Sequence, residues 1–160
     1  MFFKILQENR KLRKENKLLK KEARTDYLTG LLNRRGIEER IAEERERIER
    51  YNAKNFSMLF LDLDKLKKIN DTKGYDEGDR AIQKAAEIIE KNLRKVDVPA
   101  RVGGDEFLVL LPETTTREAL TAAEKIRKKA SREGIMISAG VGREKEKAQK
   151  EMQKEKRSKN

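Results

Sequence analysis

The segment that most constrains the fold is ARVGGDEFLVLLP, residues 100–112, in which two glycines and two acidic residues precede an apolar run. The apolar stretches on either side of Gly103–Gly104 are typical of two strands joined by a tight turn. Asp105 and Glu106 therefore stand where the turn enters a strand that must be buried. A solvated loop would account for acidic residues, but not for their position beside such a strand.

Apolar periodicity predicts that strands and helices alternate along the chain. Buried strands are predicted at 56–63, 98–102, 106–111 and 135–141. Helices are predicted from Asn33, which can cap the first turn, to about Ala53, from Lys65 to about Thr72, from about Asp79 to Arg94, from Thr115 to near Ser131, and from Glu144 onward. The order βαββαβ predicts an α+β fold: a ferredoxin-like, palm-type sheet that contains antiparallel strands and carries its helices on one face.

Two further expectations concern single segments. Gly74–Gly78 is expected to form a loop between two helices. The first long helix after Asn33 is expected to turn one face toward the core, formed by Ile37, Ile41, Ile48 and Tyr51.

Residues 2–23 follow a heptad pattern, which predicts a coiled-coil stalk over residues 1–24. The d positions are Ile5, Leu12 and Leu19, and the a positions are Phe2, Asn9, Asn16 and Ala23. The flanking positions carry the opposite charges that a parallel homodimer uses, with Glu8 and Glu15 at g and Arg13 and Lys20 at e. A solvated helix with incidental leucines is the alternative.

The net charge of +11 lies at the two ends of the chain. Residues 1–24 carry nine Lys and Arg against three Glu, and residues 143–160 carry eight against four, so the middle is nearly neutral. A nucleic-acid-binding face is therefore not expected. The absence of Cys and His excludes thiolate nucleophiles and histidine-ligated metals, so any metal must be bound by oxygen. No apolar stretch is long enough for a membrane span, and we expect a cytoplasmic protein.

Carboxylates also end the first predicted strand. Asp62 and Asp64 share a face, and a carboxylate in an apolar strand is costly unless a cation or donor compensates it. If the hairpin pairs beside this strand, Asp105 can face Asp62. Carboxylate oxygens suit Mg²⁺ or Mn²⁺, whose coordination substrate phosphates usually complete. A turn of two glycines permits positive φ and lets a triphosphate approach the backbone closely. For Asp64 alone, a cap on the following helix is the favoured alternative.

With these motifs the chain resembles the GGDEF-domain diguanylate cyclases. The family motif is intact at residues 103–107, and it is accompanied by DYLTGLLNRRG (26–36), LDLDKLKKINDTKGYDEGD (61–79) and RKVDVPARVGGDEF (94–107). The similarity extends over about residues 26–142, and it implies a GGDEF domain over residues 25–160.

The resemblance implies roles for the matching residues. Two Mg²⁺ or Mn²⁺ ions per active site would be bound by Asp62, by Asp105 and by the carbonyl of Leu63. Asp105 would also help to deprotonate the attacking 3′-hydroxyl, Glu106 would support the site, and Lys67 would join the catalytic residues by holding phosphates. The residues implied to bind GTP are Lys65, Leu66, Asn70, Tyr75, Asp79, Gly103, Gly104 and Lys156.

Two pairs would contact guanine. Asn70 and Asp79 would read the substrate base, because a carboxylate can accept hydrogen bonds from both N1–H and N2–H, which adenine does not offer together. A helix N-cap is the alternative for Asp79. Arg94 and Asp97 match the family's inhibitory site for the product, with a surface ion pair of small worth as the alternative.

The chain departs from the family at three places. Tyr75 replaces the usual His and Leu66 the usual Phe. The segment AQKEMQKEKRSKN (148–160) is a shortened, degenerate form of the last helix, in which Lys156 and Lys159 would hold the triphosphate. Because this helix is charged and has few apolar anchors, we expect it to dock poorly.

The implied activity is the Mg²⁺-dependent condensation of two GTP into cyclic di-GMP, with release of two pyrophosphates. Each protomer would hold one GTP, so the stalk and the GGDEF domains would form a homodimer, and the product would inhibit it. The alternative is a catalytically weak domain that acts as a receptor for GTP or cyclic di-GMP.

Overall fold

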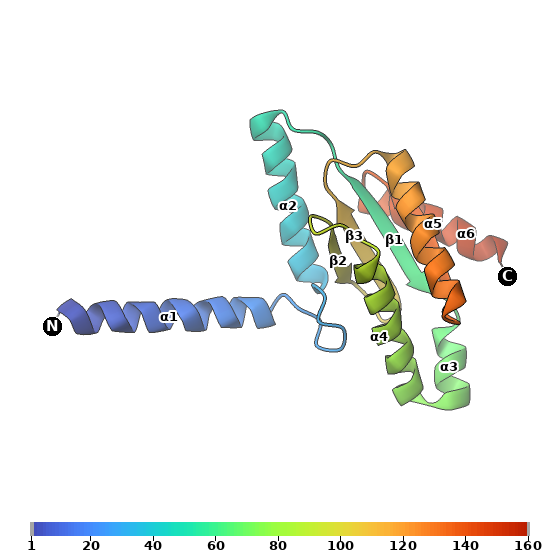
Figure 1. Ribbon diagram of the computed structural model, residues 1–160, viewed down its shortest axis with the longest axis horizontal. Coiled ribbons are helices and arrows are strands. Elements are labelled where there is room, and N and C mark those ends of the chain that lie inside the picture. The colour runs from blue at the N-terminus through green and yellow to red at the C-terminus, as the bar shows by residue number, and fades with distance from the viewer. Residues whose placement is uncertain (1, 160) are drawn as a thin grey trace.

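The computed structural model describes residues 2–159, apart from six side chains in the first helix (Phe2, Lys17, Leu18, Lys20, Lys21 and Glu22). The heptad assignments of the Phe2 and Lys20 side chains, and the terminal Asn160, lie outside the described residues. The helices are α1 (Phe2–Glu22), α2 (Arg34–Tyr51), α3 (Leu66–Lys73), α4 (Tyr75–Lys91), α5 (Thr116–Arg132) and α6 (Lys145–Ser158), and the strands are β1 (Ser57–Leu63), β2 (Val98–Arg101), β3 (Glu106–Leu111) and β4 (Ile137–Gly142) (Figure 1).

The four strands form one sheet in the order β2-β3-β1-β4. Each strand runs antiparallel to its neighbours, and the register places Asp62 of β1 opposite Glu106 of β3. This is the arrangement that the predicted βαββαβ order requires, because each crossover helix connects two strands separated by a third. The ferredoxin-like α+β fold is confirmed.

Helices cover both faces of the sheet, so the prediction of helices on one face is wrong. Leu59, Leu61 and Leu63 of β1 point into a core beneath α4 and α5. Met58 and Phe60 point into a second core, which receives residues of α2 and α6. All seven residues of β1 are buried, as expected for a strand covered on both sides.

Helix α6 docks tightly on the second face, which corrects the expectation of poor docking. Ala148 and Met152 are buried, with 0% and 2% of their surface exposed. A Cβ atom on Gly140 of β4 would lie 2.0 Å from the backbone nitrogen of Met152, and one on Gly142 would lie 2.7 Å from that of Ala148. Because these glycines let the helix backbone rest on the strand, two apolar anchors suffice.

The predicted loop at Gly74–Gly78 is instead the first turn of α4, which begins at Tyr75. Gly74, with φ of 89°, is the single residue between α3 and α4. Gly78 is buried inside α4, where a Cβ atom would lie 1.8 Å from Oδ1 of Asn70, so this glycine serves close helix packing rather than a turn. Asp79 consequently lies within the helix, and the alternative that it caps the N-terminus is wrong.

Local capping predictions are confirmed. Oδ1 of Asn33 accepts a hydrogen bond from the Gly36 backbone and caps α2, and Thr115 and Glu118 form a capping box on α5. One core assignment in α2 is wrong: Ile37 and Ile41 are buried and Ile48 packs partly buried against the same core, but Tyr51, the last residue of the helix, is 70% exposed.

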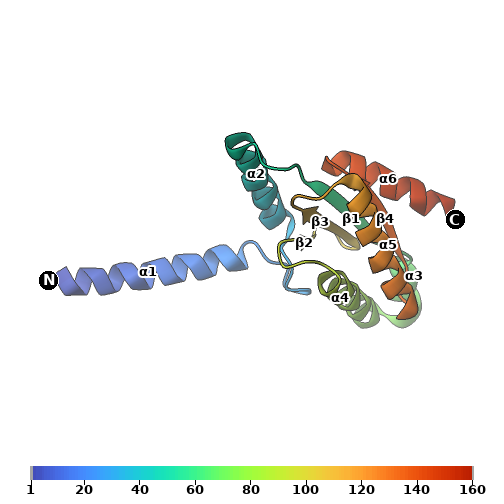
Figure 2. The same cartoon turned by 45° about the horizontal axis from the view of Figure 1, so that its top comes forward.

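Helix α1 extends away from the domain (Figures 1 and 2). Its predicted d residues Ile5, Leu12 and Leu19 are half or more exposed. Isolated apolar side chains in a row along a helix are what a partner helix would cover. Within the part of the chain that the structure describes, no helix is long and apolar enough to cross a membrane.

Candidate active site

Buried carboxylates lie at the end of β1, as predicted for Asp62 and Asp64. Their residues are only 6% and 9% exposed. Nζ of Lys156, on α6, donates a hydrogen bond to Oδ1 of Asp62. Burial raises the pKa of Asp62 from 3.8 to about 6, the hydrogen bond from Lys156 opposes this rise, and the neighbouring Asp105 adds to it. An ionised Asp62 therefore depends on positive charge supplied nearby.

The turn that carries Asp105 is joined directly to the end of β1. The Leu63 backbone N–H donates to the Asp105 carbonyl over 2.9 Å. Asp105 was expected to face Asp62 across neighbouring strands. The residue opposite Asp62 in the sheet register is instead Glu106, and Asp105 precedes it by one position. The chain thus brings Asp62, Asp105 and Glu106 to one corner of the sheet.

Asp64 does not cap α3, which corrects the favoured alternative for this residue. The N-cap position is Lys65, with φ of 63° and no side-chain cap. Oδ1 of Asp64 instead accepts a hydrogen bond from the Ser138 hydroxyl on β4 at 2.7 Å, and Oδ2 pairs with Lys159 Nζ at 3.3 Å. Ser138 was not among the predicted site residues.

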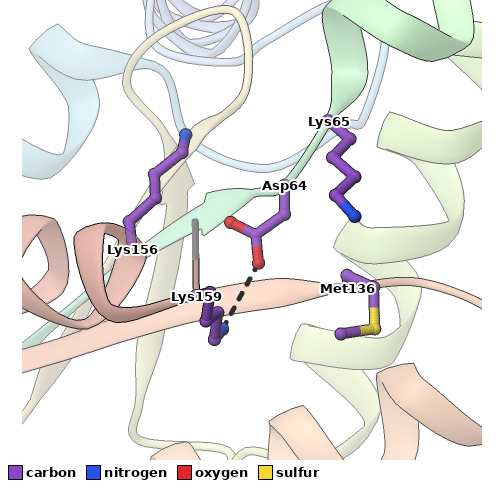
Figure 3. A pocket seen from close by; sticks show the side chains of 5 residues that line it. All are labelled: Asp64, Lys65, Met136, Lys156 and Lys159. Carbon is purple, nitrogen blue, oxygen red and sulfur yellow. Dashed lines mark hydrogen bonds and ion pairs between the residues drawn. The ribbon is translucent and has the colours of Figure 1, made fainter.

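A pocket of about 310 Å³ opens beside these carboxylates. Figure 3 shows Asp64 at its centre, with Lys65 before α3, Lys156 on α6 and Lys159 at the C-cap of α6 around it. The lining residues are Asp64, Lys65, Met136, Lys156 and Lys159. Lys65, the N-terminus of α3 and Lys156, which pairs with Asp62, favour an anionic ligand there, whereas the charge of Lys159 is already balanced by Asp64 and Glu155.

Arg101, which was not among the predicted site residues, links the glycine turn to Asp26 near the start of the domain. The Arg101 guanidinium donates to the Gly104 carbonyl at 2.8 Å and pairs with Asp26 at 3.3 Å. Neither Gly103 nor Gly104 has positive φ. A Cβ atom on Gly104 would meet nothing within 4 Å, whereas one on Gly103 would lie 2.6 Å from Oε2 of Glu106, so the backbone of the turn is open at Gly104 and closely packed at Gly103.

The predicted guanine contacts lie on α3 and α4, outside the pocket lining. Asn70 has a buried Oδ1 that accepts no hydrogen bond within the described chain. Asp79 is exposed, as are Lys67 on α3 and Tyr75 at the first position of α4. Leu66 is buried in the core, so only its backbone can take part in binding. Asn70, Tyr75 and Asp79 therefore lie near the α3–α4 junction, whereas Leu66 and Lys67 lie at the start of α3.

Arg94 and Asp97 lie before β2, at the opposite end of that strand from the glycine turn. Nη2 of Arg94 donates to Oδ1 of Asp97 at 2.8 Å and to Oγ1 of Thr114 at 2.6 Å. The Asp97 side chain is 4% exposed, whereas that of Arg94 is 56% exposed. The ion pair of the alternative interpretation is therefore formed, and Nε and Nη2 of the guanidinium are engaged within the protein although the Arg94 side chain is more than half exposed.

The donor chemistry of the carboxylate corner fits a hard divalent cation. Asp62 and Asp105 offer oxygen ligands, and a buried carboxylate gains from a nearby positive charge. Across residues 2–159, however, no three acidic side chains gather closely enough to form a complete metal site. Oxygen atoms from the backbone and from a bound phosphate would have to complete the coordination.

Comparison with known proteins places these features in a family. Residues 23–156 match the family model described as diguanylate cyclase, GGDEF domain. The response regulator PleD of Caulobacter vibrioides is 40% identical over 120 residues, which cover 75% of this chain and 26% of PleD. The chain thus spans about a quarter of that relative.

Two solved structures have the same fold over most of the chain. The diguanylate cyclase SiaD from Pseudomonas aeruginosa, in complex with its activator SiaC, superposes with a TM-score of 0.79 at 35% identity, covering 95% of this chain and 65% of that one. The coiled coil and GGDEF domain of DgcB from Caulobacter crescentus, in complex with c-di-GMP, gives a TM-score of 0.77 at 25% identity, covering 95% and 86%.

Proposed function

This chain belongs to the GGDEF-domain family of diguanylate cyclases, and from that premise we propose that it condenses two GTP molecules into cyclic di-GMP with release of two pyrophosphates. The observation that carries the proposal is that Asp62, Asp105 and Glu106 lie at the same end of β1 and β3, beside a pocket lined by Lys65, Lys156 and Lys159. Acidic groups for a metal and basic groups for phosphates stand next to each other there, as phosphoryl transfer requires.

Within this proposal, Asp62, Asp105 and the Leu63 carbonyl would hold Mg²⁺ or Mn²⁺, two ions per site. The ions would supply Lewis acidity toward the α-phosphate and the 3′-hydroxyl. Asp105 also accepts the proton of the attacking hydroxyl, and Glu106 supports the site from the paired strand position. The positive pocket favours a triphosphate near Lys156 and the Gly103–Gly104 turn, whose backbone is open at Gly104.

The start of α3 contributes to phosphate binding in two ways. Backbone N–H groups at Lys65–Leu66 lie at a helix N-terminus, where anions are stabilised. Lys67 lies in the first turn of α3, and its side chain is exposed and therefore accessible to a phosphate of a bound nucleotide. The buried Leu66 side chain holds this turn against the core.

The guanine base is assigned to the α3–α4 junction. Oδ1 of Asn70 accepts no hydrogen bond within the described chain, but it is buried against Gly78, so the Asn70 side chain would have to rotate before it could accept from a guanine N–H group. Asp79 can accept from N1–H and N2–H together, which adenine cannot match. The exposed Tyr75 ring, at the start of α4, is available to the base.

Dimerisation belongs to the proposed mechanism, because one domain holds only one of the two reacting nucleotides. Each 3′-oxygen attacks the α-phosphorus of the other GTP, a P–O bond forms, and the bond to pyrophosphate breaks. The exposed apolar row along α1 supports a parallel coiled coil that keeps two half-sites at high effective concentration.

Product inhibition is assigned to Arg94 and Asp97. The Arg94 guanidinium suits the O6/N7 edge of guanine or a phosphate, and Asp97 can accept from guanine N–H groups. Binding there requires the two side chains to exchange their mutual hydrogen bonds for bonds to the ligand.

The alternative, a receptor that binds GTP or cyclic di-GMP without turnover, was favoured by the altered C-terminal segment. That support weakens because α6 is docked and carries Lys156 into the site. Incubation of the purified protein with GTP and Mg²⁺ separates the two functions. Conversion of GTP to cyclic di-GMP supports the enzyme, whereas intact GTP with tight dinucleotide binding supports the receptor.

A further inference from the structure

The Asp62 carboxylate has one cationic partner within the described chain, and it comes from the far end of the sequence. Nζ of Lys156 donates to Oδ1 of Asp62, 94 residues away. The Asp62 side chain is 8% exposed, so an ionised carboxylate there would be costly without compensation. The ammonium therefore supplies the charge that a metal ion would otherwise supply.

The two lysines of α6 differ in how firmly they are held. Lys159 Nζ donates hydrogen bonds to Oδ2 of Asp64, to the Ile137 carbonyl and to Oγ of Ser138, and it forms an ion pair with Glu155 at 3.0 Å. Since an ammonium has three donors, Lys159 has none left for a ligand. Lys156 makes a single described contact, to Asp62, and its side chain is 36% exposed along the pocket. Lys156 is thus the lysine with donors available for a new partner.

We propose that Lys156 is the resident counter-cation of Asp62 in the metal-free protein, and that it gives up Asp62 for the triphosphate when a metal–nucleotide complex binds. This inference rests on the proposed function for the identity of the ligand. It adds an ion exchange: a divalent cation arriving alone must compete with an ammonium for a buried carboxylate, whereas a cation arriving with phosphates offers that ammonium a new anionic partner.

The exchange makes binding of the metal and the nucleotide cooperative, because each ligand favours the same Lys156 position. Coupling between ligands is reciprocal, so removal of Lys156 should act on both. It should strengthen binding of the cation alone and weaken binding of the nucleotide.

The test measures Mn²⁺ binding to the full chain without nucleotide, from the electron paramagnetic resonance signal of free Mn²⁺. Lys156→Met should bind Mn²⁺ roughly fivefold or more tightly than wild type, and should bind a non-hydrolysable GTP analogue more weakly. Lys154→Met is the matched control, because it removes the same charge two residues before Lys156. The Lys154 side chain is 72% exposed and pairs with Glu151 rather than with a residue of the site.

Unchanged or weaker Mn²⁺ binding in Lys156→Met would overturn the proposal. So would equal tightening in Lys154→Met, because general electrostatics would then account for it. Lys156→Gln, which keeps a polar side chain, guards against a folding defect and should show the same tightening. If wild type converts GTP but the Lys156 variants bind Mn²⁺ no more tightly than wild type, this inference alone is rejected. If the Lys156 variants bind Mn²⁺ more tightly but wild type does not convert GTP, the proposed function alone is rejected.

Discussion

Met152 in α6 lies so close to Gly140 in β4 that no side chain fits between the two backbones. A Cβ atom on Gly140 would stand 2.0 Å from the Met152 nitrogen and 2.1 Å from the Ala148 carbonyl oxygen. This contact seats the helix that brings Lys156 to Asp62. The geometry of the site therefore depends on a glycine in the last strand.

Gly140→Ala should destabilise the domain by about 2–3 kcal/mol, because the clash is between backbone atoms and cannot be relieved by a rotamer change. Urea unfolding measures the loss. Gly104→Ala is the control, since a Cβ atom there would meet nothing within 4 Å. Equal stability of Gly140→Ala and wild type would show that α6 does not pack as described.

Asp62 should make stability depend on pH in the metal-free protein. Its folded pKa of about 6 exceeds the ordinary 3.8, so the folded state holds the proton more tightly than the unfolded state. The stability that protonation contributes is present below about pH 4 and is lost as pH rises through about 6. Asp62→Asn removes this titration, so its stability relative to wild type should rise over that interval by up to about 3 kcal/mol.

Chemical denaturation in a chelator at several pH values measures this difference. Asp71→Asn, on the exposed side of α3, controls for loss of a surface carboxylate. The charged groups around Asp62 are Lys156, Asp105 and Asp64. If the stabilities of Asp62→Asn and wild type run parallel from pH 4 to pH 7, burial does not raise the pKa of Asp62.

Arg94→Ala should raise the final yield of cyclic di-GMP without changing the initial rate in product-free enzyme, because it removes the guanidinium of the inhibitory site. Progress curves measure both quantities. Lys95→Ala, at the neighbouring exposed position, is the control. Curves that level off at the same product concentration in wild type and Arg94→Ala would leave Arg94 and Asp97 as a structural ion pair.

Deletion of residues 1–23 should make specific activity fall steeply on dilution, because the half-sites then meet only by diffusion. The full chain should keep its activity to lower protein concentration. Rates across a dilution series provide the measurement. A truncated protein that is equally active at nanomolar concentration would show that the stalk does not hold the dimer together.

Features set by neighbouring residues could be predicted from the sequence. Asn33 and the Thr115–Glu118 box cap helices within three residues of themselves, so local chemistry decides them. The strand order also follows from the alternation of elements. The presence of helices on both faces of the sheet could also have been inferred. The β1 segment does not alternate between apolar and polar residues, and such a strand is buried on both sides.

Long-range polar contacts could not be predicted in the same way. Arg101 with Asp26, and Ser138 with Asp64, are separated by 75 and 74 residues, and no local pattern pairs them. The start of α4 was misplaced for a related reason: Gly78 suggests a turn, but its lack of a side chain serves packing against Asn70 on α3. Tertiary packing overrides the local preference there.

The most direct test of the account is a single reaction with GTP and Mg²⁺ in which GTP, pyrophosphate and cyclic di-GMP are all quantified, for wild type and for Asp105→Asn. Wild type should release two pyrophosphates for each cyclic di-GMP, and Asp105→Asn, folded but lacking a metal-binding charge, should form neither. Intact GTP in the wild-type reaction, or ordinary turnover by Asp105→Asn, would contradict it.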